Sequence, residues 1–330
     1  MRVSIIMAVY NGEKFIGKQL DSLINQTYSI YELIIQDDLS TDNTFNIIEE
    51  YACQYPFIHI FQNESRKGIN ENFYSAMEKA TGDYIAICDQ DDEWEPEKIE
   101  LQVKHIGENN WLCGCFSKPF SETGAWSFDN RIPNCSIERL IHISSALPGH
   151  TQMFKREILP LVLRFRDMPI LYDHLISIIA ASYQKIIFID KPLVNHRMYH
   201  ASATFTVPIM NPTGKGNRNL PNIMRSFFRT FRIYIEIRPQ IRQWFMMINQ
   251  ILQSLPAENA EIKDALKVVK YQSQRGIISY IKLTFMYLKL RKKIFHVEEK
   301  NTILSILRAG YFPISCSDYF RYMAKAYTNK

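Results

Sequence analysis

The first part of the chain alternates short apolar runs with segments of helical spacing, and this alternation restricts the fold more than any other feature. The predicted strands are residues 3–9, 31–36, 57–62 and 84–88, and the predicted helices between them are 13–26, 43–53 and 69–80. Strands that alternate with helices in this way form βαβ units with right-handed crossovers. The chain is therefore predicted to be an α/β protein with a Rossmann-like, mostly parallel sheet flanked by helices.

Polar and acidic residues follow three of these strands at the points where the strands end. In chain order they are Tyr10 and Asn11, then Asp37 and Asp38, then Asp89, Gln90 and Asp91. In open parallel sheets, ligands bind outside the carboxyl ends of the strands. We expect these side chains to meet in one pocket although they lie far apart in sequence.

The acidic stretch from Asp89 to Glu93 has two interpretations. Carboxylates this close repel one another unless a hard divalent cation binds them through oxygen, and Mg²⁺ and Mn²⁺ are such cations. The alternative is an acidic turn that caps the following helix, since Asp favours loops and helix N-termini. An isolated Asp-x-Asp favours the turn, so a metal site needs support from the rest of the chain.

Several other classes of site are disfavoured. No GxGxxG follows the first strand and no Walker-A glycine loop is present, so neither a dinucleotide site nor a P-loop is supported. The six cysteines include no CxxC pair, which favours a reduced, cytoplasmic compartment. The N-terminus enters a strand without the long apolar region of a signal peptide, and no run of about 18 apolar residues would span a membrane.

The net charge of +5 hides two halves of opposite sign. Residues 1–205 carry 18 Lys and Arg against 27 Asp and Glu, a net charge of −9, whereas residues 206–330 carry 21 against 7, a net charge of +14. Proline and glycine gather between the halves. We predict an α/β domain at 1–206, a linker at 207–221 and a basic helical extension at 222–330.

Three motifs together resemble the family 2 glycosyltransferases of the GT-A fold. They are Ser4-Ile5-Ile6-Met7-Ala8-Val9-Tyr10-Asn11, then Gln36-Asp37-Asp38-Leu39-Ser40-Thr41-Asp42, then Asp89-Gln90-Asp91-Asp92-Glu93-Trp94 with Pro96 and Lys98 after it. Their order, spacing and strand-end context agree over roughly the first 200 residues. The last motif is similar to the branch often described as rhamnosyltransferases. Pro is usual at Ala8 and Gly at Leu39, and these departures remove no ligand.

The resemblance implies roles for individual residues. It implies that Asp91 is a direct metal ligand and that Asp89 reaches the ribose or a metal-bound water. It implies that Asp38 accepts a hydrogen bond from the pyrimidine ring. The other residues that it places at the nucleotide sugar are Ala8, Tyr10, Asn11, Asp37, Lys67, Asn72 and Gln90.

The later part of the same domain is expected to supply the catalytic base. Asp173, in the motif Tyr172-Asp173-His174, matches the family's base, although by itself it could be the N-cap of the helix predicted to begin at Leu175. Arg197 matches the closing loop and would stabilise the leaving group, or it is a surface residue. Either His200 or Tyr199 takes the place of the family's last histidine, a further metal-ligand candidate. His150 and His174 are expected to be packed or hydrogen-bonded rather than metal ligands.

These parts predict an inverting, metal-dependent glycosyltransferase. The expected donor is a UDP- or dTDP-linked sugar, the cofactor is Mn²⁺ or Mg²⁺, and the acceptor is a hydroxyl of a glycan or lipid-linked glycan in surface polysaccharide synthesis. Two alternatives remain open. A sugar-nucleotide pyrophosphorylase would need a glycine-rich, basic loop after the first strand, and the chain has Tyr10-Asn11-Gly12-Glu13 there. A non-catalytic nucleotide- or glycan-binding scaffold is disfavoured because Asp38, Asp89, Asp91 and Asp173 are all present.

The basic extension is expected to be all-helical, with helices at 222–237, 241–255, 257–271, 277–290 and 302–307. Residues 277–293 are apolar and aromatic and end in a basic cluster, which suits attachment to the inner face of the cell membrane. The alternative is a helix that packs on the catalytic domain or on a second subunit of a homodimer. No nucleic-acid motif accompanies the positive charge.

Overall fold

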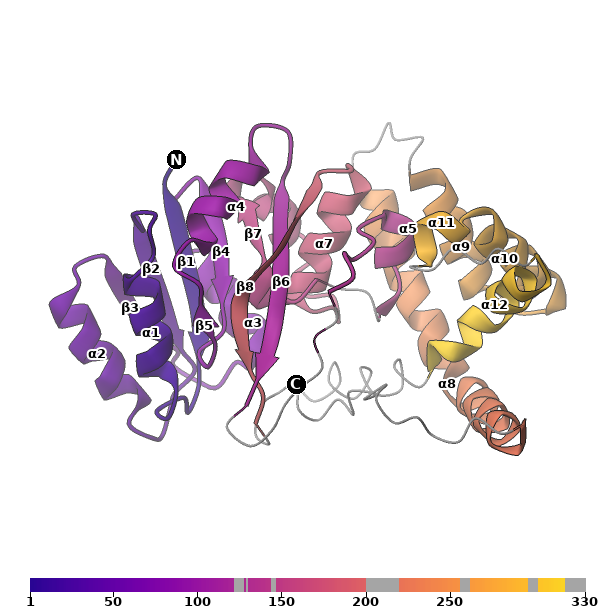
Figure 1. Cartoon of the computed structure of the whole chain (residues 1–330), viewed down its shortest axis with the longest axis horizontal. Helices are drawn as coiled ribbons and strands as arrows, with labels where there is room; N and C mark the ends of the chain where they lie inside the picture. The colour runs from indigo at the N-terminus through magenta and orange to yellow at the C-terminus, as the bar shows by residue number, and fades with distance from the viewer. Residues whose placement is uncertain are drawn as a thin grey trace. The chain divides into compact units, whose positions relative to one another are not determined.

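The structure is a computed structural model that describes residues 1–121, 128, 130–143, 147–199, 220–255, 262–295 and 302–317. Its strands are β1 (Val3–Val9), β2 (Glu32–Asp37), β3 (Ile58–Gln62), β4 (Tyr84–Cys88), β5 (Glu93–Trp94), β6 (Leu112–Phe120), β7 (Met153–Lys155) and β8 (Ile186–Arg197). They form one eight-stranded sheet in the order β3-β2-β1-β4-β7-β6-β8-β5 (Figure 1).

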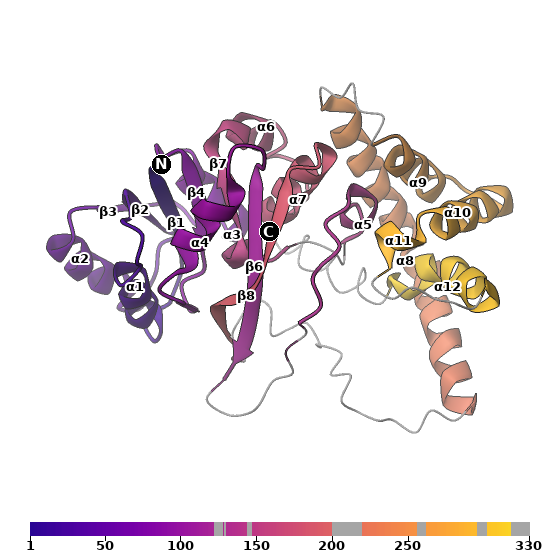
Figure 2. The same ribbon diagram turned by 45° about the horizontal axis from the view of Figure 1, so that its top comes forward.

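The four predicted N-terminal strands are confirmed as a parallel set. The helices that accompany the sheet are α1 (Ile16–Ile24), α2 (Thr44–Gln54), α3 (Ile69–Met77), α4 (Lys98–Ile106), α6 (Leu159–Leu163) and α7 (Tyr172–Ser182). Figures 1 and 2 show α1 and α4 on one face of the sheet and α3 on the other. β1, β2 and β4 are buried along almost their whole length, as expected for central strands covered on both faces.

The second half of the sheet is mixed. β7 runs antiparallel to both β4 and β6, and β6 pairs with β8 in parallel. The two-residue strand β5 pairs antiparallel with β8, so that Glu93 lies opposite Asn195. This pairing brings the acidic stretch after β4 beside the end of β8.

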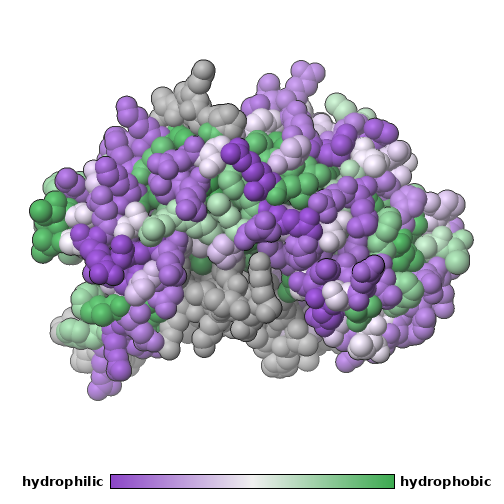
Figure 3. All heavy atoms as spheres, turned by 180° about the vertical axis from the view of Figure 1, so that it is seen from behind, coloured by the Kyte–Doolittle hydropathy of each residue, from purple (hydrophilic) through white to green (hydrophobic). Residues whose placement is uncertain are grey.

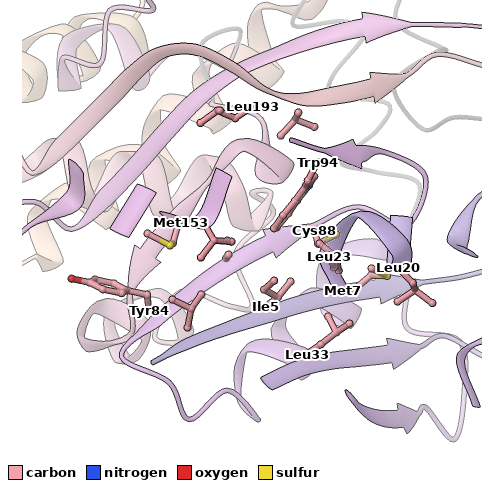
Figure 4. Packing of buried hydrophobic residues seen from close by; sticks show 14 of the residues in the cluster. Ile5, Met7, Leu20, Leu23, Leu33, Tyr84, Cys88, Trp94, Met153 and Leu193 are labelled. Carbon is pink, nitrogen blue, oxygen red and sulfur yellow. The ribbon is translucent and has the colours of Figure 1, made fainter. Parts of the chain in front are cut away.

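A single apolar cluster fills the space between the sheet and the helices on the α1 side. Figure 4 shows Met7 of β1, Leu20 of α1 and Trp94 of β5 pointing into it, and each is less than 5% exposed. Burial of a side chain of this size contributes about 1.5–3 kcal/mol to folding. This packing supports the acidic tip, which is the stretch from Asp89 to Glu93 that follows β4.

The remaining helices are α5 (Ile137–Leu140), α8 (Leu220–Ser254), α9 (Lys263–Ser273), α10 (Ile277–Lys289), α11 (Arg291–Ile294) and α12 (Thr302–Ser315). The chain divides into two compact units. The first holds residues 1–132, 147–180 and 185–206, and the second holds 133–146, 181–184 and 207–330. The predicted domain limits therefore differ from the packing, because residues 133–146 belong with the C-terminal helices. Trp244 Nε1 donates to the carbonyl of Ile141 at 2.9 Å in this second unit.

The prediction of a helix break at Pro239 is wrong. α8 continues through Pro239 without interruption. A proline inside a helix costs about 3 kcal/mol, and apolar packing on both sides of it offsets that cost, since Ile237, Ile241 and Trp244 are each less than 10% exposed. Most of the predicted linker, residues 207–219, lies outside the described residues. Among the described helices, none combines the length and the apolar content that crossing a bilayer requires.

Candidate functional site

The loops after β1 and β4 are joined through a side-chain amide. Gln90 Oε1 accepts the backbone N–H of Tyr10 at 2.9 Å, and Gln90 Nε2 donates to the Tyr10 carbonyl at 3.0 Å. A Cβ atom at Gly12 would lie 2.6 Å from Gln90 Oε1, so only glycine leaves room for this contact. Gln90, expected to touch the nucleotide, therefore fixes the backbone of Tyr10.

Asp38 is a buried carboxylate surrounded by hydrogen-bond donors. It accepts from Asn63 Nδ2 at 2.8 Å, from the backbone N–H groups of Lys67 at 2.7 Å and Gly68 at 2.9 Å, and from Arg66 Nε at 3.1 Å. Burial opposes ionisation, but these hydrogen bonds hold the pKa of Asp38 below its ordinary value. Gly68 adopts φ +81°, which suits glycine and lets both N–H groups point at the carboxylate.

The guanidinium of Arg66 also covers an aromatic ring. Its central carbon lies 3.3 Å from the centroid of the Tyr10 ring, within range of a cation–π contact. The Arg66 side chain is 51% exposed, whereas that of Asp38 is 3% exposed. The planar, half-exposed guanidinium of Arg66 thus occupies the space over Tyr10 and beside Asp38. A flat ring with an N–H donor would fit in the same space.

Three of the expected nucleotide residues hold these loops together instead. Asp37 is fully buried and accepts from the Ser40 N–H at 3.1 Å and from Gln62 Nε2 at 2.9 Å. Asn72, also buried, donates to the Gln36 carbonyl at 2.9 Å. Asn11 Oδ1 accepts the N–H of Thr41 at 2.8 Å. Asp37 and Asn72 are thus buried and hydrogen-bonded, as Asp38 is, and their contact with a nucleotide sugar stays a prediction.

The other expected nucleotide residues lie at the edge of the same region. Ala8 sits on β1 opposite Gln36 of β2 and is partly exposed. Lys67 contributes its backbone N–H to Asp38 and has an exposed side chain. Leu39, where the resemblance expected glycine, adopts φ +59°. That left-handed conformation costs a non-glycine residue about 1–2 kcal/mol, so the turn is kept despite the substitution.

The acidic tip is paired with residues from β8 and from the short 3-10 helix Gly149–Thr151. Asp92 is fully buried, and its Oδ1 lies 2.9 Å from His196 Nδ1 and 3.0 Å from the N–H of Arg197. His150 Nδ1 lies 3.1 Å from Asp89 Oδ2 and 3.6 Å from Asp92 Oδ2. The rings of His150 and His196 stack with centroids 4.6 Å apart. Two stacked imidazoles therefore contact the carboxylates of the acidic tip.

Neighbouring charges shift the proton affinities at this tip. Burial raises the pKa of Asp91 to about 6, and the carboxylates of Asp89 and Asp92 add to the rise. Burial alone would lower the pKa of His150, but Asp92 and Asp89 raise it to about 9. Asp91 is thus a buried carboxylate whose ionisation its acidic neighbours oppose. Its Oδ2 accepts one hydrogen bond, from Tyr199 at 2.7 Å.

Two donor sets in the described part of the chain are candidates for holding a metal ion. Asp89 and Asp91 offer oxygen ligands at the tip, which hard cations such as Mg²⁺ and Mn²⁺ prefer. Asp92, His150 and His196 offer one oxygen and two nitrogens, and their ligand atoms all lie within 4.8 Å of one another. Asp92 Oδ2 is buried and has no hydrogen-bond partner. The second set was missed from the sequence, which predicted that His150 is packed or hydrogen-bonded rather than a metal ligand.

Strand β8 ends at Arg197, beside the acidic tip. Arg197 Nε donates to the Asp91 carbonyl at 3.0 Å, and its guanidinium lies between the rings of Phe15 and Phe120 at 4.6 and 4.5 Å. The residue is 3% exposed. It therefore supports the acidic loop and is not the surface residue of the alternative interpretation, while its contact with the leaving group stays a prediction. His200 lies outside the described residues.

Asp173 lies in the first turn of α7 rather than before it, so it is not the helix N-cap. Its Oδ1 accepts the N–H of His174 at 2.7 Å. Burial raises its pKa to about 6, and the charge of Asp89 contributes to the rise while His150 opposes it. A Cβ atom at Gly149 would lie 2.5 Å from the Tyr172 hydroxyl, so this glycine allows α7 to approach the 3-10 helix. A carboxyl with a raised pKa thus lies close to the acidic tip.

Comparison with known proteins identifies the family. The profile described as "Glycosyl transferase family 2" matches residues 4–186, more than half of the chain. The dTDP-rhamnosyl transferase RfbG of Shigella flexneri is 34% identical over 160 residues, which are 46% of this chain and 55% of that protein. The UDP-Glc:alpha-D-GlcNAc-diphosphoundecaprenol beta-1,3-glucosyltransferase WfgD of Escherichia coli is 38% identical over 109 residues, 33% of this chain and 42% of WfgD. The chain thus spans about half the length of these relatives.

A solved structure supports the fold. The crystal structure of S. aureus TarS 1-349 in complex with UDP superposes with a TM-score of 0.50 over 97% of this chain and 91% of that one, at 16% identity. The same protein in complex with UDP-GlcNAc gives a TM-score of 0.51 at 17% identity. At this identity the likeness concerns the fold alone. It agrees with the curled α/β sheet of the first unit and the helices that follow it.

Proposed function

The chain belongs to glycosyl transferase family 2, and we propose that it transfers a sugar from a nucleoside-diphosphate sugar to a hydroxyl of a glycan or lipid-linked glycan in surface polysaccharide synthesis. One observation carries the proposal. The loops at the carboxyl ends of β1, β2 and β4 lie within one compact unit. They carry Asp38, a buried carboxylate that accepts several hydrogen bonds, and Asp91, a buried carboxylate with a raised pKa. The two relatives named above support both the donor class and the acceptor class.

The nucleobase is proposed to bind over Tyr10 and against Asp38. The donor would be dTDP- or UDP-linked, as in the names of those relatives. Asp89 and Asp91 would hold Mn²⁺ or Mg²⁺ through oxygen. When bound, that cation would act as a Lewis acid that neutralises charge on the departing diphosphate.

Asp173 is proposed to accept the proton of the attacking hydroxyl. A base with a pKa of about 6 is ionised at neutral pH and still binds a proton well enough to draw it from the acceptor. The raised pKa follows from burial, and the short contact of α7 with Gly149 sets the position of the carboxyl. A single base without an enzyme nucleophile gives inversion at the anomeric carbon.

Calorimetric titration tests the donor site directly. The full chain is titrated with UDP, dTDP and GDP, each with Mn²⁺ and again with EDTA. We expect one pyrimidine diphosphate to bind with metal, and we expect EDTA to weaken that binding. A preference for dTDP would favour a deoxysugar donor. Absence of binding by all three in Mn²⁺ would overturn the proposal and favour a non-catalytic scaffold.

Activity should fall in acid. The pKa of Asp173 is raised to about 6, so the carboxylate needed as base is present above that pH and is lost as the pH falls through it. We therefore expect kcat to drop about tenfold per pH unit below pH 6, measured at saturating donor and metal. If kcat instead falls only around pH 4, a carboxyl with an ordinary pKa serves as the base.

Arg66 should compete with the nucleobase. Its guanidinium uses the Tyr10 ring and Asp38, the same two groups proposed for the base. A half-exposed contact of this kind is worth about 1 kcal/mol, so Arg66→Ala is expected to tighten binding of the preferred diphosphate about fivefold. Lys104→Ala, which removes an equal charge from exposed α4, is the control. Weaker binding by Arg66→Ala would mean that the guanidinium itself contacts the nucleotide.

A further inference from the structure

Helix α10 of the C-terminal unit leaves an apolar face in contact with solvent. Ile277, Ile278, Ile281 and Phe285 are 76, 67, 49 and 67% exposed. At the helical advance of about 100° per residue, these four positions fall within one third of the helix circumference. The opposite part of α10 is buried, with Leu283 and Tyr287 at 2 and 0% exposure. The exposed residues therefore form a continuous stripe along the helix.

Helix α12 packs beside α10 and extends this apolar surface. Tyr280 of α10 donates a hydrogen bond to the Gly310 carbonyl of α12, and the rings of Tyr287 and Phe312 lie 5.0 Å apart. α12 adds Ile306 and Leu307, which are 46 and 61% exposed. In Figure 3, apolar atoms lie at the outer edge of the C-terminal unit, on the left of the view. Soluble monomers rarely expose apolar groups in this number together.

The charge around this surface has one sign. Residues 262–295 and 302–317 contain ten Lys and Arg and one acidic residue, Asp264, which is paired with Lys267 and Lys289. By the same helical advance, Lys282 and Lys289 border the apolar stripe of α10. Exposed Arg291, Lys292 and Lys293 follow directly on α11, and Lys293 is paired with Glu138 of α5 at 2.7 Å. The surface of α10 and α12 is thus apolar with a strongly basic border.

We propose that the surface of α10 and α12 binds an anionic membrane. The apolar stripe would enter the boundary between headgroups and acyl chains, and the lysines would meet lipid phosphates. A second copy of the chain fits less well, because two equally basic borders would then face each other. The inference deepens the proposed function. It rests on that function only for the purpose of membrane binding, which would be access to a lipid-linked acceptor.

Vesicle binding by the full chain tests this surface. Co-sedimentation is measured with vesicles of phosphatidylcholine alone and of phosphatidylcholine and phosphatidylglycerol in equal parts. We expect at least about tenfold tighter binding to the anionic vesicles. The double variant Ile281→Ser, Phe285→Ser should weaken that binding at least about tenfold. Lys282→Gln should weaken it about fivefold, and only on anionic vesicles.

Matched variants separate this surface from general charge and apolarity. Lys104→Gln on α4 makes the same charge change, and Met246→Ser removes an apolar side chain that is 52% exposed on α8. Both should bind vesicles as the wild type does. UDP or dTDP titration of every variant should be unchanged, so failure of the membrane proposal is distinct from failure of the donor site. Absence of vesicle binding overturns the proposal, as does a wild-type dimer that the Ile281 and Phe285 variant dissociates.

Discussion

Asp173→Asn should lower kcat about 10²–10⁴-fold while nucleotide binding is unchanged. This is the usual contribution of a positioned general base. The substitution is conservative for the structure, because the asparagine oxygen can still accept the N–H of His174 that Asp173 Oδ1 accepts at 2.7 Å. Steady-state transfer and calorimetric nucleotide affinity would be measured on the same preparation.

The stability of this variant separates a catalytic role from a structural one. The raised pKa of Asp173 means that the folded chain favours the neutral acid, so the ionised group costs stability at neutral pH. Asparagine is neutral, and Tm should therefore stay equal or rise. Asp167→Asn, an exposed position in the turn before α7, is the control and should keep full activity. Wild-type turnover by Asp173→Asn, or a lower Tm together with lost activity, would contradict the assignment.

Asp91→Asn should remove most of the metal-dependent nucleotide affinity. Substitution of a residue that hydrogen-bonds a metal ligand lowers metal affinity about 10–100-fold. Loss of a direct ligand should therefore lower it at least about a hundredfold. Asparagine can still accept the hydrogen bond from Tyr199, so the loop should keep its position. Calorimetry with Mn²⁺ and the preferred diphosphate measures the effect. Asp190→Asn, an exposed carboxylate on β8, is the control.

The two candidate donor sets give opposite results in this experiment. If the cation binds Asp89 and Asp91, His196→Gln should retain metal-dependent binding to within a few-fold, because His196 then only supports Asp92. If the cation instead binds Asp92, His150 and His196, that variant should lose it and Asp91→Asn should keep it. The second pattern would overturn the assignment of Asp91.

Local pattern was enough to predict the first half of the sheet. β1 to β4 are apolar runs bounded by turns and separated by helical segments, and they pair in parallel with one another. Polar residues follow directly on these strands. The topology of a parallel sheet was therefore enough to predict that the loops after β1, β2 and β4 converge. The second half does not follow the regular alternation of strand and helix, because β7 inserts antiparallel between β4 and β6 and β6 pairs in parallel with β8.

The C-terminal half shows the same limit. Pro239 is a breaker by local rules, yet α8 continues because residues on both sides of it are buried against other helices. Residues 133–146 were assigned by their position in the chain, but a tryptophan on α8 draws them into the second unit through a hydrogen bond to Ile141. Such contacts have no local signature.

The sequence by itself determined the α/β class, the family and the acidic tip, because strand periodicity and closely spaced carboxylates are properties of short stretches. Only the tertiary structure decided what each polar residue does. Asp37 and Asp38 are neighbours and both are buried, but Asp37 accepts hydrogen bonds from Ser40 and Gln62, whereas Asp38 accepts them from the 66–68 loop. His150 and His196 meet Asp92 because β8 and the 3-10 helix converge there. A side chain's partners depend on how distant segments pack, and one sequence stretch cannot carry that information.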